Sequence, residues 1–163
     1  MSTKHCKHCD RDLPLYMFTK DRNKKDGLSF YCKDCMFEYA KKYRKTAAGI
    51  YISAKYQRRN KKPFALTRKE FYNWYEKQPK KCHYCWLPES ELENIDDPQL
   101  NRMSRLGLDC VDNKKGYLID NIVLCCLRCN FIKNDLLDYE AMKDIGQRYV
   151  KPIWEKRLGK TFS

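Results

Sequence analysis

The sequence predicts a small α+β protein stabilised by metal ions, with two modules joined by a basic helical segment. Two observations lead to this fold class. Eight of the ten cysteines form four C-x-x-C pairs, and two short apolar runs flank a glycine-containing loop just before the last pair. A chain of 163 residues is long enough for one ordinary domain or two small ones.

The cysteine pairs predict two structural zinc ions. Each C-x-x-C turn directs two sulfurs at one ion, and two turns complete the tetrahedral four-thiolate shell of zinc. The polar amino-terminus and the lack of a run of ~20 apolar residues predict an intracellular protein, in the cytoplasm, the nucleoid or a virus-infected cell. Thiols stay reduced there, so disulfides are the less favoured alternative. The expected ligands are Cys6, Cys9, Cys32 and Cys35 for the first zinc, and Cys82, Cys85, Cys126 and Cys129 for the second.

Residues 1–36 are expected to form the first module, which resembles a zinc ribbon. So small a module cannot bury enough apolar surface to fold alone, so the metal must supply much of its folding free energy. His5 and His8 are expected at the surface, because four cysteines already complete the zinc shell. The expected minimal core consists of Leu13, Tyr16, Phe18 and Phe30.

Residues 37–66 are expected to form a basic helical linker, either one long helix or two helices hinged near Gly49. The formal net charge of +13 favours a polyanionic partner. Tyrosines alternate here with cations that can neutralise phosphates. A solvated linker whose tyrosines pack on a neighbouring domain is equally compatible with this pattern. The expected phosphate-binding residues of the linker are Lys41, Lys42, Arg44, Lys45, Arg58 and Arg59.

Residues 67–163 are expected to form the second module. Thr67 and Glu70 match a capping box that starts a helix, in which Phe71, Trp74 and Tyr75 form a buried stripe. The acidic, proline-containing stretch 86–105 is expected to be a surface loop or insertion.

The second module then continues with two strands and a helix. The runs RLGLDCV and NIVLCC are expected to be the strands, and the turn between them spans residues 112–116. A helix is expected to begin after Cys129 and to restart after a cap at Asp138. Cys125 is expected to point into the core, while Cys126 binds zinc.

The motifs KCHYC, LGLDCVDNKKGYLIDN and CCLRCNFIKND resemble the zinc-bearing form of the HNH, or ββα-metal, endonucleases. The branch that they resemble is related to endonuclease VII-like enzymes of phages and mobile elements. The resemblance implies that Asp109 and Asn130 hold a catalytic Mg²⁺ or Mn²⁺ and that Asn121 tethers the loop. Carboxylate and amide oxygens suit such a hard cation. The resemblance also places three lysines near the metal, where they could bind phosphates: Lys114, Lys115 and Lys133.

Cys110 departs from the family pattern, because it occupies the position of the histidine that activates water. A thiol has an ordinary pKa of about 8.5 and accepts hydrogen bonds poorly, so Cys110 is a weak general base. Asp112 is the better substitute if the strand bends. Cys110 as an inert, packed thiol remains an alternative.

Two functions follow from these observations. The first is divalent-metal-dependent cleavage or nicking of DNA by an HNH-type endonuclease without the usual histidine. The second is a catalytically inactive relative that binds nucleic acid inside a larger nucleoprotein assembly. RNA stays open as the polymer, because positive charge and tyrosines do not distinguish the sugars.

Overall fold

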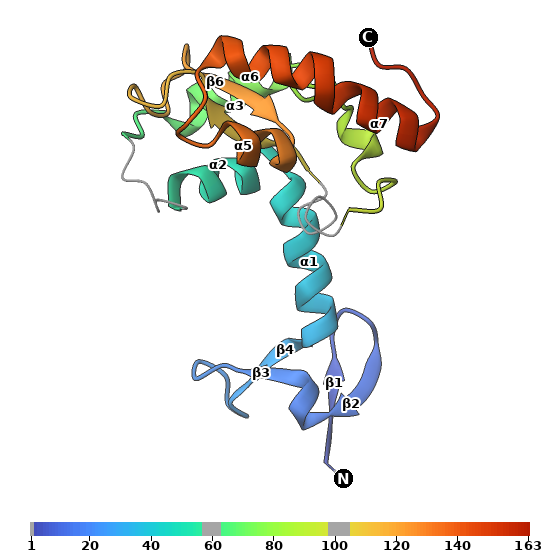
Figure 1. The fold of residues 1–163 in the computed structure, drawn as a ribbon. Helices are drawn as coiled ribbons and strands as arrows, with labels where there is room; N and C mark the ends of the chain where they lie inside the picture. Colours follow the sequence, from blue (N-terminus) through green and yellow to red (C-terminus); the bar gives the residue numbers. More distant parts are fainter. Residues whose placement is uncertain (1, 57–62, 98–104) are drawn as a thin grey trace. The chain divides into compact units, whose positions relative to one another are not determined.

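The computed structural model describes residues 2–56, 63–97 and 105–163 (Figure 1). The chain divides into two compact units, Met1–Thr46 and Ala47–Ser163, each with short antiparallel strands, helices and one four-cysteine group. The predicted zinc-stabilised α+β class is therefore confirmed. The boundary between the units lies inside the segment expected to be a linker. None of the described helices is both long and apolar enough to span a lipid bilayer.

The amino-terminal unit contains two hairpins followed by a helix. β1 pairs with β2 and β3 pairs with β4, both antiparallel. The helix begins directly after the last strand, so the second cysteine pair lies where a strand becomes a helix. The elements are β1 (Thr3–Cys6), β2 (Arg11–Pro14), a 3-10 turn (Leu15–Met17), β3 (Phe18–Lys20), β4 (Leu28–Cys32) and α1 (Lys33–Lys45).

The core of this unit is very small. Phe18 is buried against Cys6 and Cys32, and these three residues form its buried apolar cluster among the described residues. Tyr16 and Phe30 were expected in the core, but they are 71% and 41% exposed. The expectation was wrong because two short hairpins enclose too little volume to cover three aromatic rings.

The carboxy-terminal unit has a much larger core, formed by a β-hairpin and the helices around it (Figure 1). Its elements are α2 (Ala47–Tyr56), α3 (Arg68–Lys77), a 3-10 turn (Glu89–Glu91), β5 (Gly107–Cys110), β6 (Ile122–Cys125), α5 (Leu127–Lys133), α6 (Tyr139–Ile145), a π-helical turn (Gly146–Val150) and α7 (Lys151–Leu158).

Up to Tyr56, the expected linker segment lies in two helices, α1 and α2, and the break between them lies at Thr46. Thr46 is extended, and its side chain donates a 2.7 Å hydrogen bond to the carbonyl oxygen of Tyr43. Gly49 was expected at the hinge, but it is buried inside α2. A threonine hydroxyl that competes for a helical carbonyl therefore ends α1.

The capping box that starts α3 is confirmed. The Thr67 hydroxyl accepts a 3.2 Å hydrogen bond from the Glu70 amide, and the Glu70 carboxylate accepts a 3.0 Å bond from the Thr67 amide. Phe71 and Tyr75 are buried and Trp74 is half-buried, so the helix turns the predicted aromatic stripe inward.

The acidic stretch that follows α3 was expected at the surface, but part of it belongs to the core. Leu87, Leu92 and Ile95 are almost fully buried. The buried carboxylate of Asp97 pairs with Arg128, which lies between the last two zinc-site cysteines. Three apolar side chains thus join this stretch to the core of the unit, and one ion pair joins it to α5. The rest of the stretch, 98–104, lies outside the described residues.

The predicted hairpin and helix are present at the centre of this unit. β5 and β6 pair antiparallel, with Asp109 opposite Val123. α5 starts at Leu127, with Cys126 as its N-cap. The helix was expected to begin only after Cys129. It begins earlier, so Cys126 is its N-cap and Cys129 lies in its first turn. The expected cap of α6 is confirmed, because the Asp138 side chain accepts a 2.8 Å bond from the Ala141 amide.

Candidate functional site

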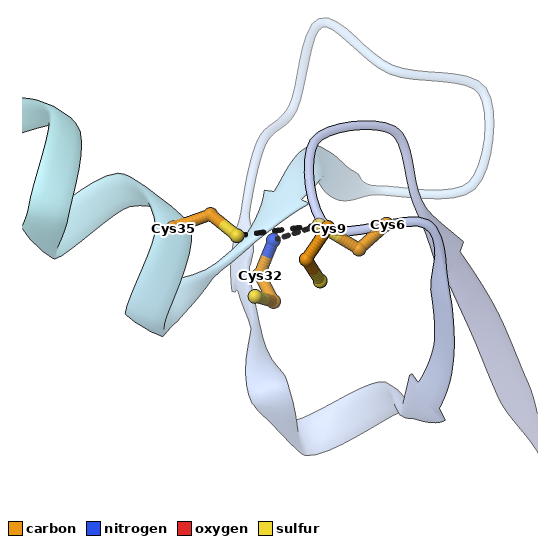
Figure 2. A group of neighbouring side chains, drawn as sticks. All are labelled: Cys6, Cys9, Cys32 and Cys35. Carbon is orange, nitrogen blue, oxygen red and sulfur yellow. Dashed lines mark hydrogen bonds between the residues drawn. The ribbon is translucent and has the colours of Figure 1, made fainter.

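The eight paired cysteines form two separate groups of four, as predicted. Within each group the sulfur atoms all lie within 4.8 Å of one another. Two sulfurs bound to one tetrahedral zinc at ~2.3 Å lie about 3.8 Å apart. The Cys6–Cys35 and Cys85–Cys126 sulfur distances are both 3.8 Å, so both groups could hold zinc. Figure 2 shows the first group, Cys6, Cys9, Cys32 and Cys35.

The first pair of each group lies in a tight turn of the same construction. The Asp10 amide donates to the Cys6 carbonyl at 3.0 Å, and the Trp86 amide donates to the Cys82 carbonyl at 2.9 Å. Asp10 and Trp86 both have positive φ angles, of 57° and 59°. This left-handed residue reverses the chain directly after the pair, so that both sulfurs face the same point.

The second pair of each group lies at a helix amino-terminus. Cys32 is the N-cap of α1 and Cys126 is the N-cap of α5, and helix amino-termini favour the thiolate form of cysteine. Backbone amides also donate to sulfur, as from Cys32 to Cys6 at 3.2 Å. Burial opposes ionisation of Cys6, but amide hydrogen bonds from Cys9, Cys32 and His8 outweigh it and lower the Cys6 pKa to about 5.

Cys125, His5 and His8 are not members of the two four-cysteine groups. Cys125 is fully buried outside the second group, and burial together with the Asp109 charge raises the pKa of its thiol. His5 and His8 are exposed, as expected. The membership of both four-cysteine groups, including Cys126 and not the adjacent Cys125, could therefore be predicted from C-x-x-C spacing alone.

Asn121 closes the loop between β5 and β6. Its side-chain oxygen accepts from the Asp112 amide at 2.9 Å, and its side-chain nitrogen donates to the carbonyls of Asp112 and Gly116 at 2.8 and 2.7 Å. Asn121 is only 4% exposed. A buried amide with three backbone partners fixes the loop shape, and this arrangement agrees with the tether role implied by the resemblance.

Asp109 is the next-to-last residue of β5 and is buried between a tyrosine and a lysine. Its Oδ2 atom accepts a 2.7 Å hydrogen bond from the Tyr84 hydroxyl and lies 3.2 Å from the Lys133 ammonium. Burial and the Asp109 charge raise the pKa of Tyr84 far above its ordinary value, so this phenol remains a donor. Lys133 is completely buried, so it does not face solvent as a phosphate-binding lysine would.

The two candidate bases are constrained in different ways. Cys110 is 1% exposed, so in this arrangement its thiol does not reach solvent water. Asp112 is half-buried, and its carboxylate accepts a 2.8 Å bond from the Lys114 amide within the loop. Asp112 is thus more accessible to solvent than Cys110. Its carboxylate, however, already accepts a hydrogen bond within the turn.

Asn130 lies in α5, with its side-chain nitrogen 3.5 Å from the Leu108 carbonyl. It borders a recess of about 100 Å³ whose other walls include Leu108 and Tyr117. The oxygen donors of Asp109 and Asn130 have the chemistry that a hard divalent cation requires, so this residue set fits Mg²⁺ or Mn²⁺ by ligand type.

Most of the predicted phosphate-binding cations are accessible. Lys114 and Lys115 are exposed on the β5–β6 loop, whereas Lys45 is half-buried. Arg58 and Arg59 lie outside the described residues. The predicted cations Lys41, Lys42 and Arg44 are exposed on α1.

Two aromatic contacts were missed by sequence reasoning. Tyr84 lies between two zinc-site cysteines and contacts Asp109, and His83 Nε2 lies 2.9 Å from the Tyr139 hydroxyl. No motif marks either contact. The only available sequence signal was the presence of two aromatic residues inside the KCHYC turn.

The hairpin, the tethered loop and the cysteine-capped helix define an HNH-like ββα arrangement, and comparison with solved structures agrees. The chain is similar to the rare-cutting HNH restriction endonuclease PacI, with a TM-score of 0.53 and 24% identity. The similarity covers 94% of this chain and 96% of that enzyme. At this identity the likeness concerns the fold.

Sequence comparisons give less information. No family model matches the chain. An uncharacterized protein of Acanthamoeba polyphaga mimivirus, R423, is 34% identical over 73 residues. The matched segment is 45% of this chain but spans only 11% of the viral protein.

Proposed function

We propose that this protein is a divalent-metal-dependent DNA endonuclease or nickase of the HNH type, with a residue other than histidine in the general-base position. The observation that carries the proposal is the fold similarity to an HNH restriction endonuclease, which extends over 94% of the chain. A basic net charge of +13 supports a nucleic-acid substrate.

In this proposal the site residues have distinct roles. Asp109 and Asn130 would hold Mg²⁺ or Mn²⁺, which when bound stabilises charge on the scissile phosphate. Asn121 holds the loop shape, and the second zinc group fixes α5 against the hairpin. Asp112 acts as the base, because a carboxylate accepts a proton from water more readily than the buried thiol of Cys110.

The amino-terminal unit and the linker helices are proposed to grip the DNA, while residues 67–163 cleave it. Around the exposed ring of Phe30, the ammonium groups of Lys7 and Lys24 lie 4.4 and 4.2 Å from the ring centroid. Neither lysine forms an ion pair with an acid among the described residues. Two unneutralised cations gathered on one ring favour a phosphate backbone as partner.

A second candidate function is supported by the environment of Cys110. A buried thiol in place of the base fits a nucleic-acid-binding protein that retained the zinc-stabilised scaffold and lost cleavage. Such a protein would act inside a larger nucleoprotein assembly.

A plasmid-nicking assay separates the two functions. Supercoiled plasmid is incubated with Mg²⁺ or Mn²⁺ and the wild type, Asp109→Asn, or Asp120→Asn, an exposed acid just before β6 that serves as the matched control. The endonuclease proposal predicts metal-dependent nicking by the wild type and the control but not by Asp109→Asn. DNA binding by all three proteins without nicking would establish the second function. Competition with RNA in the same binding assay tests the choice of polymer.

A further inference from the structure

Lys133, the last residue of α5, lies beside Asp109 and has no role in the proposed reaction. Its side chain is 0% exposed, although a lysine ammonium loses a large hydration free energy on burial. Three oxygen atoms compensate for this loss. The ammonium donates to the Cys110 carbonyl at 2.7 Å, pairs with Asp109 Oδ2 at 3.2 Å and lies 3.5 Å from Asn113 Oδ1.

The lysine therefore interacts with the carboxylate that would bind the divalent ion. Tyr84 also donates to the same Oδ2 atom, at 2.7 Å, so that oxygen already has two donors. A divalent cation bound to Asp109 would lie within a few ångströms of a buried ammonium. Charges at such a distance repel strongly where water is excluded.

We propose that Lys133 is a resident cation of this site that competes with the divalent metal for Asp109. This inference rests on the proposed function, since it concerns the same carboxylate. A divalent ion on either oxygen of Asp109 would be repelled by the nearby Lys133 ammonium, which can keep its 2.7 Å hydrogen bond to the Cys110 carbonyl. The Lys133 ammonium thus offsets the negative charge that Asp109 offers to a divalent ion, and this lowers the affinity of the site for that ion.

Competition and an ordinary positioning role predict opposite effects on metal affinity when Lys133 is removed. If Lys133 only oriented Asp109 for the metal, its removal would weaken metal binding. If it competes, replacing the ammonium with an apolar group of similar length strengthens metal binding. We expect Lys133→Met to bind Mn²⁺ at least about tenfold more tightly than the wild type.

The test measures Mn²⁺ binding directly, by electron paramagnetic resonance of the free ion, on the zinc-loaded full chain. The variants are Lys133→Met, Lys133→Gln and the matched control Lys156→Met, which removes an exposed lysine of α7. Tighter binding in both Lys133 variants, with no change in the control, supports the inference. Unchanged or weaker binding in the Lys133 variants overturns it.

Asp109→Asn separates this inference from the proposed function. This substitution is introduced into the wild type and into Lys133→Met. If Lys133 competes with the metal, the gain in Mn²⁺ affinity that Lys133→Met brings should disappear in the double variant. If Mn²⁺ binds in neither background with Asp109 intact, the proposed metal site fails and this inference fails with it. If Mn²⁺ binds through Asp109 in the wild type but Lys133→Met brings no gain, only the inference fails.

A measurement on the wild type guards against variants that do not fold. Breaking a buried ion pair can be strongly destabilising, so zinc content and thermal unfolding are checked for each variant. In wild-type protein labelled with ¹⁵N-lysine, the buried Lys133 ammonium should give a signal that shifts on saturation with Mg²⁺. A Lys133 signal that does not respond to saturating Mg²⁺ overturns the competition.

Discussion

The two four-cysteine groups consist of the same kind of ligand and are built in the same way, but they lie in units with very different cores. Each group combines a tight turn closed by a left-handed residue with a helix amino-terminus. The first group has Phe18 as its buried aromatic neighbour, whereas an extensive apolar cluster surrounds the second. Cys9 and Cys35 are half-buried residues, while all four cysteines of the second group are buried. A metal bound to each group would therefore support folding almost alone in one unit and together with a packed core in the other.

Loss of one cysteine ligand tests this difference most severely. Zinc binding to small modules contributes on the order of 10 kcal/mol to folding. We expect Cys9→Ser to unfold the amino-terminal unit completely and to leave the other unit folded. We expect Cys126→Ser to retain one zinc and to leave the carboxy-terminal unit partly ordered around its apolar core. Zinc stoichiometry by native mass spectrometry and amide dispersion by NMR measure both effects.

Cys125→Ser is the matched control for the ligand variants. It changes the adjacent buried sulfur, which lies outside the four-cysteine group. It should retain two zinc ions and lose only the roughly 1–3 kcal/mol expected for burying a hydroxyl. Loss of a zinc ion in this variant would contradict the assignment of Cys126 as the ligand.

Extraction by a chelator compares how well the two groups are shielded. A chelator needs access to the sulfurs, which local opening provides more easily in a unit with few buried apolar contacts. We expect the first zinc to leave at least about tenfold faster than the second. Zinc release followed with a colorimetric chelator should therefore show two phases, and Cys9→Ser should lack the fast phase. A single phase for both ions would show that the cores do not govern release.

Glycine substitutions probe the two cores more gently. A Cβ atom added at Gly146 would lie 2.6 Å from the Tyr84 carbonyl oxygen, in the tightly packed unit. Gly146→Ala should cost about 3 kcal/mol through overpacking. Gly27, in the small unit, has a φ of 70° and open space around it, so Gly27→Ala should cost only about 1 kcal/mol. Thermal unfolding of each variant measures the difference, and equal costs would contradict the contrast in packing.

The parts of the structure that could be predicted from sequence depend on local chemistry. The C-x-x-C spacing brings the two sulfurs of a pair together through a single tight turn, so both four-cysteine groups could be predicted. The same holds for Thr67 and Glu70, whose capping bonds span a single turn. The β5–β6 hairpin followed from two apolar runs and a glycine loop.

The parts that could not be predicted depend on long-range burial. Lys133 reads as a surface charge, and only the folded chain brings Asp109 and two further oxygens around its ammonium. Leu87 and Ile95 show no periodicity among their acidic neighbours, so their burial has no sequence signal. Tyr84 lies inside a zinc turn, where composition gives no indication that its hydroxyl reaches Asp109.

The smallest expected effect concerns DNA contact by the amino-terminal unit. If the exposed aromatic residues and lysines of this unit bind DNA, their side chains are kept at the surface for that contact, and fewer of them are left to form a core. We expect the double variant Lys7→Gln, Lys24→Gln to weaken binding to duplex DNA severalfold. It should also reduce the slope of log affinity against log salt by roughly 2, because two phosphate contacts are lost. Lys20→Gln, an exposed lysine of β3, is the control within the same unit. An equal change per lysine in the control would mean that net charge, and not the cluster on Phe30, governs binding.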